Sequence, residues 1–324
     1  MPPKRPDRVT VRDLVEYSVF RIAFTTVCAL GLERACALAR FLGRVFHRFD
    51  RRRRETADSN LRHAFPELDA AARDRIARES VESFLVSMVE GMYTSRVLGP
   101  TRGRWRLRVE GFDAVARDVG SGPAVFVTGH LGNWEVLGSA LGLLGYPLHS
   151  VARTFPNPLM QRFTERQRGL FGQRILPKRG GVRAIMEVIR SGGHVGIVND
   201  QDAGRRGVFA EFLGRPASTF PTPATIALRF GCPIITGCCV RIDDRPYEFR
   251  VIADGAIEVD RSAPREEETL RVVGRINERL ERYVRAYPSQ YLWQHRRWKT
   301  QPDEEGAIRA RESRRRERIE TETR

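Results

Sequence analysis

The first hundred residues carry apolar side chains at the spacing of amphipathic helices. Between residues 11 and 46 they recur three and four positions apart, and helical spacing resumes between residues 70 and 97. The longest apolar segment, residues 14–32, is interrupted by Glu16 and Arg21, and its uncharged part has 11 residues. A helix that crosses a bilayer core about 30 Å thick needs roughly 20 apolar residues. The pattern therefore predicts amphipathic helices rather than a spanning helix.

From residue 105 onward the pattern changes, because short runs rich in Val and Ile alternate with helical stretches. The runs expected to form strands are residues 105–109, 124–128, 148–152, 195–199, 233–240 and 247–252. The stretches expected to form helices are residues 133–144, 157–170, 181–190, 222–230 and 267–286. This alternation predicts a layered α/β fold with a mixed, largely parallel sheet flanked by helices.

The net charge of +16 is concentrated at the N-terminus, which refines this picture. Residues 1–54 hold 13 Lys/Arg and 5 Asp/Glu, a net +8, whereas residues 301–324 hold 7 of each and are neutral. A basic stretch beside an amphipathic helix suits an anionic membrane surface, although a solvated basic face has the same composition. We therefore expect membrane-associating helices over residues 1–54, a catalytic α/β domain over residues 55–300, and a charged, disordered tail over residues 301–324.

Several classes of site are disfavoured by what the sequence lacks. The five cysteines are odd in number and form no C-x-x-C pair, which argues against a disulfide framework or a zinc site and favours a reduced, cytosol-facing location. No H-E-x-x-H, phosphate-binding loop or G-x-G-x-x-G is present. We therefore expect no metal and no cofactor. A basic nucleic-acid or anionic-polymer binder remains the non-enzymatic alternative, but no recognisable binding module supports it.

The sharpest candidate for chemistry is the segment Gly-His-Leu-Gly-Asn-Trp-Glu at residues 129–135. An expected strand ends at its first glycine, and an expected helix begins near Asn133, so His130 lies where α/β proteins gather catalytic groups. A turn between them would let Glu135 reach back to the imidazole and orient it. No G-x-S-x-G nucleophile is present, so the nucleophile would be a substrate hydroxyl deprotonated by His130. The alternative is a structural His with a surface Glu.

Other candidate residues follow expected strands or stand near the C-terminus. Arg153 is the expected catalytic cation, because a fixed charge after a strand can stabilise an oxyanion. Two tryptophans beside basic residues near the C-terminus suit a lipid headgroup interface. The expected substrate-binding residues are Asn133, Asp200, Gln201, His295 and Arg296. Asp200 and Gln201 end an expected strand, which can place them beside His130, where Asp200 could bind a headgroup hydroxyl or orient the base.

The segment at residues 129–135 resembles the His-x4-Glu box of the bacterial lipid A biosynthesis acyltransferases, the lauroyl and myristoyl transferases. These enzymes are similar to glycerol-phosphate acyltransferases, which carry a His-x4-Asp box. Further segments resemble the family in the same order along the chain, over residues 50 to 298. They are residues 60–66 (Asn-Leu-Arg-His-Ala-Phe-Pro), 151–158 (Val-Ala-Arg-Thr-Phe-Pro-Asn-Pro), 198–201 (Val-Asn-Asp-Gln), 212–214 (Phe-Leu-Gly) with Thr219, 233–235 (Pro-Ile-Ile) and 291–298 (Tyr-Leu-Trp-Gln-His-Arg-Arg-Trp).

The resemblance implies an acyltransferase with a glycerol-phosphate acyltransferase-like fold. It implies transfer of a fatty acyl group from acyl carrier protein to a hydroxyl of a lipid A precursor or similar glycolipid. An acyl-CoA donor and a phosphatidylinositol mannoside acceptor are the close alternatives. The implied location is the cytoplasmic face of the inner membrane, as a peripheral or monotopic protein, because the N-terminal segment is less hydrophobic than the usual anchor of the family. No nucleic-acid partner is implied.

Overall fold

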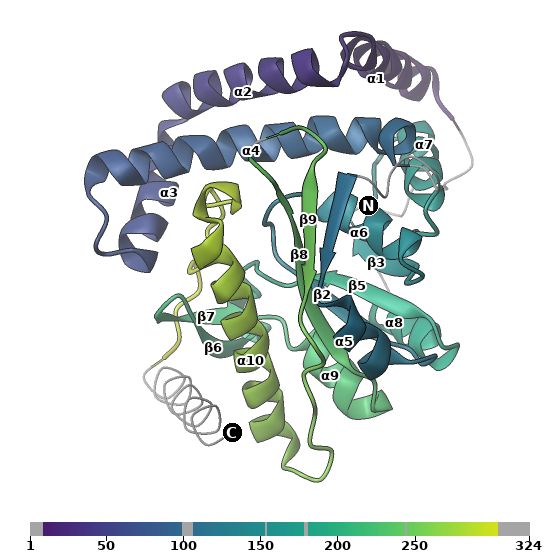
Figure 1. Ribbon diagram of the computed structural model, residues 1–324, viewed down its shortest axis with the longest axis vertical. Helices are drawn as coiled ribbons and strands as arrows, with labels where there is room; N and C mark the ends of the chain where they lie inside the picture. Colours follow the sequence, from purple (N-terminus) through teal and green to yellow (C-terminus); the bar gives the residue numbers. More distant parts are fainter. Residues whose placement is uncertain (1–8, 99–105, 153, 178–180, 244, 304–324) are drawn as a thin grey trace.

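The computed structural model describes residues 9–98, 106–152, 154–177, 181–243 and 245–303. Its centre is a seven-stranded sheet with the order β1-β9-β8-β2-β5-β3-β4 (Figure 1). The strands are β1 (Leu107–Glu110), β2 (Val125–Thr128), β3 (Leu148–Ala152), β4 (Arg174–Pro177), β5 (His194–Val198), β8 (Ile234–Arg241) and β9 (Phe249–Ala253). The β8–β9 pair is antiparallel, and the other pairs are parallel. The predicted mixed, largely parallel sheet is confirmed.

Helices cover both faces of this sheet. They are α1 (Val11–Ala29), α2 (Leu32–Phe49), α3 (Arg51–Ala64), α4 (Ala70–Val97), α5 (Phe112–Val119), α6 (Trp134–Leu143), α7 (Pro158–Gly169), α8 (Gly181–Arg190), α9 (Thr222–Phe230) and α10 (Arg265–Ala286). Two short 3-10 turns are η2 (Gly204–Arg206) and η3 (Pro288–Gln290), and a separate antiparallel hairpin joins β6 (Val208–Phe212) to β7 (Arg215–Thr219).

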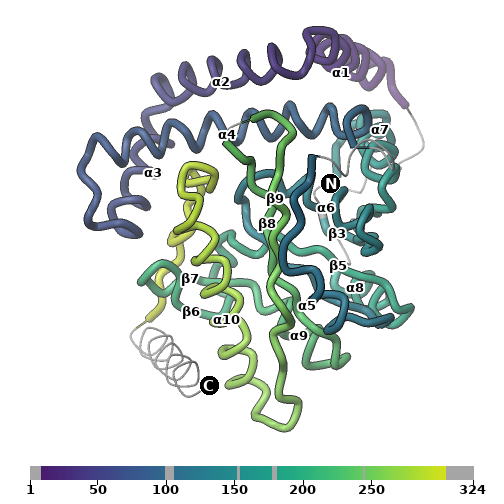
Figure 2. Tube along the Cα trace, viewed as in Figure 1, coloured from purple at the N-terminus to yellow at the C-terminus, as the bar shows by residue number. Residues whose placement is uncertain are grey.

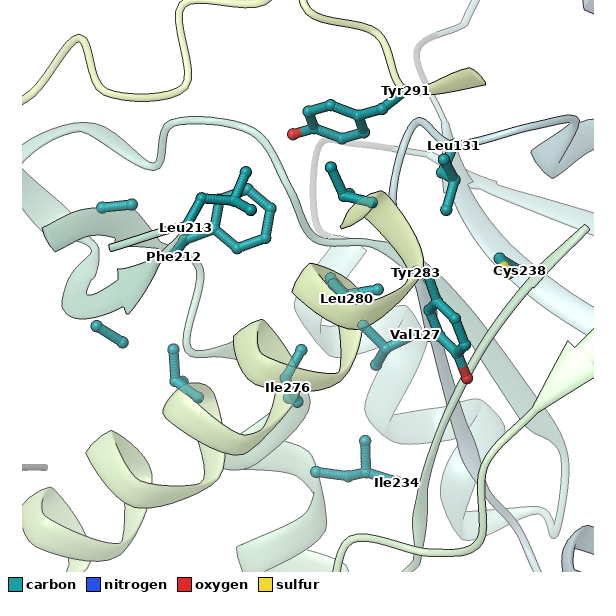
Figure 3. Close-up of a cluster of buried hydrophobic side chains, with 14 of the residues drawn as sticks. Val127, Leu131, Phe212, Leu213, Ile234, Cys238, Ile276, Leu280, Tyr283 and Tyr291 are labelled. Carbon is teal, nitrogen blue, oxygen red and sulfur yellow. The ribbon is translucent and has the colours of Figure 1, made fainter. Parts of the chain in front are cut away.

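Strand β2 shows how the sequence pattern produces two layers of core. All four of its residues are buried, and alternate side chains point to opposite faces of the sheet. Val125 and Val127 join the core packed against α8, α9 and α10, whereas Phe126 joins the core packed against α5 and α6. Figure 3 shows Val127 among side chains of α10, including Ile276 and Leu280. A strand buried on both faces reads as a continuous apolar run, which is why the sequence located it.

The N-terminal helices form a separate layer along one end of the molecule (Figures 1 and 2). Helices α1 and α2 meet at 115°, with Gly31 between them at φ +80°. Among the described residues, no single helix has the length and apolarity to cross a bilayer; taken together, the bent pair passes that test. Ala35, Cys36 and Ala39 are buried where α2 packs on α4.

The structure adds elements that the sequence analysis did not expect. These are α3, α5, β4 and the β6–β7 hairpin. The expected domain boundary at residue 54 falls inside α3, so the N-terminal layer continues into the rest of the chain through an unbroken helix. The expected disordered tail lies outside the described residues after Asp303.

Candidate active site

His130 stands two residues beyond β2, in a loop fixed from several directions. The backbone N–H of Leu292 donates to the carbonyl of His130 at 3.0 Å, and the N–H of Gly132 donates to the carbonyl of Gln290 at 3.0 Å. Gly132 has φ +59°, and a Cβ atom there would overlap the carbonyl oxygen of Cys239. A glycine is therefore required at this turn. The C-terminal segment and β8 together set the position of the imidazole.

The imidazole of His130 pairs with Asp200. Its Nδ1 lies 2.7 Å from Oδ1 of Asp200, and the backbone N–H of His130 donates to Oδ2 at 2.7 Å. Burial by itself raises the pKa of Asp200, but the charge and hydrogen bonds of His130, together with the charge of His295, outweigh burial and hold that pKa well below its usual range. An ionised carboxylate only accepts hydrogen bonds, so Nδ1 carries a proton and Nε2 is left as the basic nitrogen.

Glu135 does not bond the imidazole, which corrects the expected pairing. Its two carboxylate oxygens accept hydrogen bonds from Nε and a terminal nitrogen of Arg168, at 2.9 and 2.6 Å. The reason is geometric, because α6 begins at Trp134 and its first turn directs Glu135 toward α7. His130 precedes the tight turn at Gly132 and is directed toward Asp200. The carboxylate that orients the imidazole is therefore the one 70 residues away.

His295 is the second imidazole of the site. Its ring centroid lies 4.6 Å from that of His130, in an edge-to-face arrangement. Burial, followed by the charge of His130, lowers the pKa of His295 to about 4, and its Nδ1 is buried without a hydrogen-bond partner among the described residues. The side chain of Asn60 holds this segment by donating to the backbone carbonyls of Trp293 and His295, both at 2.8 Å.

A metal ion has one candidate set of ligands here. His130, Asp200 and His295 each offer one ligand atom, and these atoms lie within 4.8 Å of one another. Two imidazoles and a carboxylate are a donor set that zinc accepts. Sequence spacing could not reveal this set, since its members come from three distant segments. The expectation that the protein uses no metal stays a prediction.

Three of the expected substrate-binding residues, Asn133, Gln201 and Arg296, do not line the cavities near His130. Asn133 is fully buried: its Oδ1 caps α6 by accepting from the N–H of Val136 at 3.0 Å, and its Nδ2 donates to Glu90 at 2.9 Å. It shapes the loop and is closed to a ligand. Gln201 and Arg296 are exposed and do not line the cavities beside His130.

The two C-terminal tryptophans are core residues. Trp293 and Trp298 are buried, so they are not a headgroup interface. The buried guanidinium of Arg297 donates to the carbonyl of Ser218 at 2.6 Å and thereby holds the β6–β7 hairpin. Arg153 lies outside the described residues, and its expected role stays a prediction.

Two cavities lie near the His130 loop, and they share two lining residues. A mainly apolar cavity of about 150 Å³ runs between α6 and the sheet, and a wider one of about 490 Å³ lies between α4, the start of α3 and the C-terminal segment. Trp134 and Glu135 line both, whereas His130 and His295 line the wider one. Arg168 also lines the apolar cavity, and its guanidinium forms an ion pair with Glu135. Sequence analysis missed Arg168, because an arginine in the last turn of α7 carries no local signal of its contact.

Comparison with known proteins decides the family. A family model described as bacterial lipid A biosynthesis acyltransferase matches residues 6–300. The chain belongs to this family. It is therefore an acyltransferase, and the resemblance inferred from the order of its motifs is confirmed.

Relatives of this family differ in their named acceptors. The chain is 28% identical to a lipid A biosynthesis palmitoleoyltransferase of Escherichia coli (strain K12) over 277 residues, which are 84% of this chain and 87% of that protein. It is 29% identical to a phosphatidylinositol mannoside acyltransferase of Mycobacterium tuberculosis (strain CDC 1551 / Oshkosh) over 210 residues, 61% of this chain and 64% of that protein. Family membership thus fixes the reaction class and leaves the acceptor to be argued.

Proposed function

We propose that this chain transfers a fatty acyl group from a thioester to a hydroxyl of a glycolipid, with His130 as general base and Asp200 as the residue that orients it. The observation that carries the proposal is the contact of His130 with the buried Asp200, in a loop that lines the wider cavity and lies near the mainly apolar one. An acyl donor and a lipid acceptor are two substrates, and each cavity offers a place for one of them.

The proposed reaction begins when Nε2 of His130 removes the proton of the acceptor hydroxyl. The alkoxide oxygen attacks the thioester carbonyl carbon, forming a C–O bond, and the carbonyl oxygen becomes negatively charged. When the carbonyl re-forms, the C–S bond breaks and the thiolate takes the proton from the imidazolium, so atoms and charges balance. The ionised Asp200 stabilises the imidazolium during the cycle.

Arg168 is the described cation best placed to stabilise the oxyanion. Its guanidinium lines the apolar cavity, and Glu135, which holds it through two hydrogen bonds, lines both cavities. A fixed positive charge near the developing oxyanion stabilises the transition state more than the ground state. Glu135 then acts by positioning Arg168, while Arg153 remains the alternative cation suggested by the sequence.

The acyl donor is acyl carrier protein in this proposal, with acyl-CoA as the alternative. Acyl carrier protein is strongly acidic, and a chain with net charge +16 attracts it at long range. The acceptor is a lipid A precursor, as the name of the Escherichia coli relative suggests. A phosphatidylinositol mannoside is the second candidate, on the name of the Mycobacterium tuberculosis relative.

The proposed location is the surface of the cytoplasmic membrane, with the protein bound peripherally. Helix α2 exposes a set of large apolar side chains in the most basic part of the sequence, where they can enter the interface of an anionic leaflet. They are Leu38, Phe41, Leu42, Val45, Phe46 and Phe49.

A direct assay tests the proposed function. The purified chain is incubated with acyl carrier protein loaded with one acyl chain and with each of the two acceptor lipids in detergent, and the lipids are analysed by mass spectrometry. We expect one acceptor to gain the mass of one acyl group, in an ester that mild alkali removes. Thioester hydrolysis with neither acceptor modified would contradict the proposal.

A further inference from the structure

The wider cavity beside His130 has a largely apolar wall that also includes charged and polar side chains, Glu135 and Gln294 among them. Of the described residues that line it, Arg53 is the one arginine. Arg53 comes from the first turn of α3, and His130 and His295 line another part of the same cavity. The apolar side chains of the wall are Phe46, Val81, Phe84, Leu85, Met88, Trp134 and Leu292.

The guanidinium of Arg53 is held at this position by two neighbours. Its central carbon lies 5.2 Å from the ring centroid of Phe46, within the range of a cation–π contact. Its Nε lies 3.5 Å from Oδ2 of Asp50, while the other oxygen of Asp50 accepts from the backbone N–H of Arg53 at 3.0 Å. A guanidinium has five N–H donors in a planar fork, so a contact through Nε leaves the outer edge of the fork available to an anion.

Arg53 also lies close enough to His295 to affect its imidazole electrostatically. Its charge contributes, after burial and the charge of His130, to the low pKa of His295. The ring of His295 in turn contacts that of His130. An anion bound to Arg53 would therefore share one cavity with the hydroxyl that His130 deprotonates.

We propose that Arg53 binds a phosphate group of the glycolipid acceptor. The inference rests on the proposed function. A planar guanidinium matches two phosphate oxygens at once and is the side chain best suited to this group. Holding the phosphate at one side of the cavity would orient the sugar and present one hydroxyl to His130.

The surroundings of Arg53 favour a lipid phosphate over the phosphate of the acyl donor. Phe46, Phe49 and Met88 are exposed apolar side chains on the helices that flank this end of the cavity. Such a surface accepts the chains of an amphipathic lipid, while its headgroup reaches the charge beside it. The donor, by contrast, needs its acyl chain in the apolar cavity on the far side of Trp134 and Glu135.

The experiment compares Arg53→Gln with the matched control Arg51→Gln. Arg51 lies two residues earlier in the same turn, pairs with Glu55 at 2.7 Å and does not line the cavity. Both variants lose one positive charge, so general attraction to anionic surfaces falls equally. KM and kcat are measured in neutral detergent for a lipid A precursor, for the same lipid after phosphatase treatment, and for the acyl donor.

We expect Arg53→Gln to raise the KM for the phosphorylated acceptor about 10- to 100-fold, the range for one or two lost charge-assisted hydrogen bonds. Arg51→Gln should stay near wild type, and Arg53→Lys should recover part of the loss. With the dephosphorylated acceptor, wild type and Arg53→Gln should have the same KM. Matching thermal unfolding of the variants excludes a folding defect.

Three results would overturn the proposal. A raised KM for the donor in place of the acceptor would assign the phosphate to the donor. Equal effects of the two variants would mean that Arg53 contributes only to the general surface charge. An unchanged KM for the phosphorylated lipid in Arg53→Gln would mean that Arg53 does not bind the phosphate. Failure of the proposed function is distinguishable, because wild type would then transfer no acyl group to the lipid at all.

Discussion

The two cavities that share Trp134 and Glu135 as lining residues differ in how they can select a ligand. The smaller, between α6 and the sheet, is lined mainly by apolar side chains beside the Arg168–Glu135 pair and selects mainly by shape. The wider one mixes apolar side chains with Arg53, Glu135, Gln294 and two imidazoles, and selects by charge and hydrogen bonding. A cavity of about 150 Å³ in an engineered protein core admits a molecule the size of benzene, so the smaller cavity must widen to hold a long acyl chain. The smaller cavity should therefore discriminate between acyl chains by their size, and the wider one should discriminate between acceptors by their polarity and charge.

The largest effect is expected at the base, which lines the wider cavity. His130→Ala should lower kcat about 10²- to 10⁴-fold, because the acceptor hydroxyl loses the group that removes its proton. Single-turnover assays on the purified, folded variant measure the loss. A rate near that of wild type would show that the two cavities do not converge on His130.

Replacing the cation on the apolar side should have the next largest effect. Arg168→Lys keeps the charge but loses the planar fork that binds Glu135, and we expect kcat to fall about 10²-fold with the KM for the donor little changed. Glu135→Gln is the companion variant and should lose less, since Arg168 itself remains. If the KM for the donor rises while kcat is preserved, Arg168 binds the ground state and not the oxyanion.

A substitution in the wall of the smaller cavity should change acyl-chain preference and little else. Leu141 is buried and lines that cavity. With a mixture of acyl donors as substrate, Leu141→Ala should raise the ratio of longer-chain to shorter-chain product roughly threefold. The same change should lower the free energy of unfolding by about 2–5 kcal/mol. Phe84→Ala, in the wider cavity, is the control and should leave chain preference unchanged. The same shift in both variants would mean that the cavities do not divide the two substrates.

The smallest expected effect is a pH dependence of stability from His295, on the polar side. Its pKa is lowered from 6.5 to about 4 in the folded protein, mainly by burial, so between these pH values the unfolded chain binds more protons. Stability should therefore fall as the pH is lowered from 6.5 to 4. Urea midpoints across this range measure the slope, which should flatten in His295→Gln. An equal slope in the variant would assign the titration to another group.

Much of the fold was readable because its central strands are apolar runs, of which β2 and β8 are almost fully buried. Strands β2, β5 and β8 form apolar runs between glycines, prolines and helical stretches, and their predicted positions agree with the structure within one residue at each end. Edge strand β4 was missed because Arg174 and Pro177 interrupt its four residues. Helix α3 was missed because its first turn is a run of arginines without apolar spacing.

The site was predictable only as far as local sequence determines it. His130 was found because glycines and a strand end mark the loop around it. Asp200 was expected beside His130 because both follow strand ends, either to bind a headgroup hydroxyl or to orient a base, while Glu135 was expected to pair with the imidazole. Choosing between the two carboxylates needed the pairing of β2 with β5, which no local spacing encodes. Nor does local spacing reveal that Asn133 is buried against Glu90.

The anchoring of the His130 loop by Gln290 and Leu292 has a consequence for how the protein is made. Translation proceeds from the N-terminus, and chain segments fold as they emerge. Helices α1 to α4 and every strand of the sheet precede Gln290 and Leu292 in the chain. A ribosome-bound chain can therefore form the sheet while the loop that carries His130 is still unfixed. Competence for acyl transfer arises only once the segment around Gln290 and Leu292 has been made and has docked on that loop.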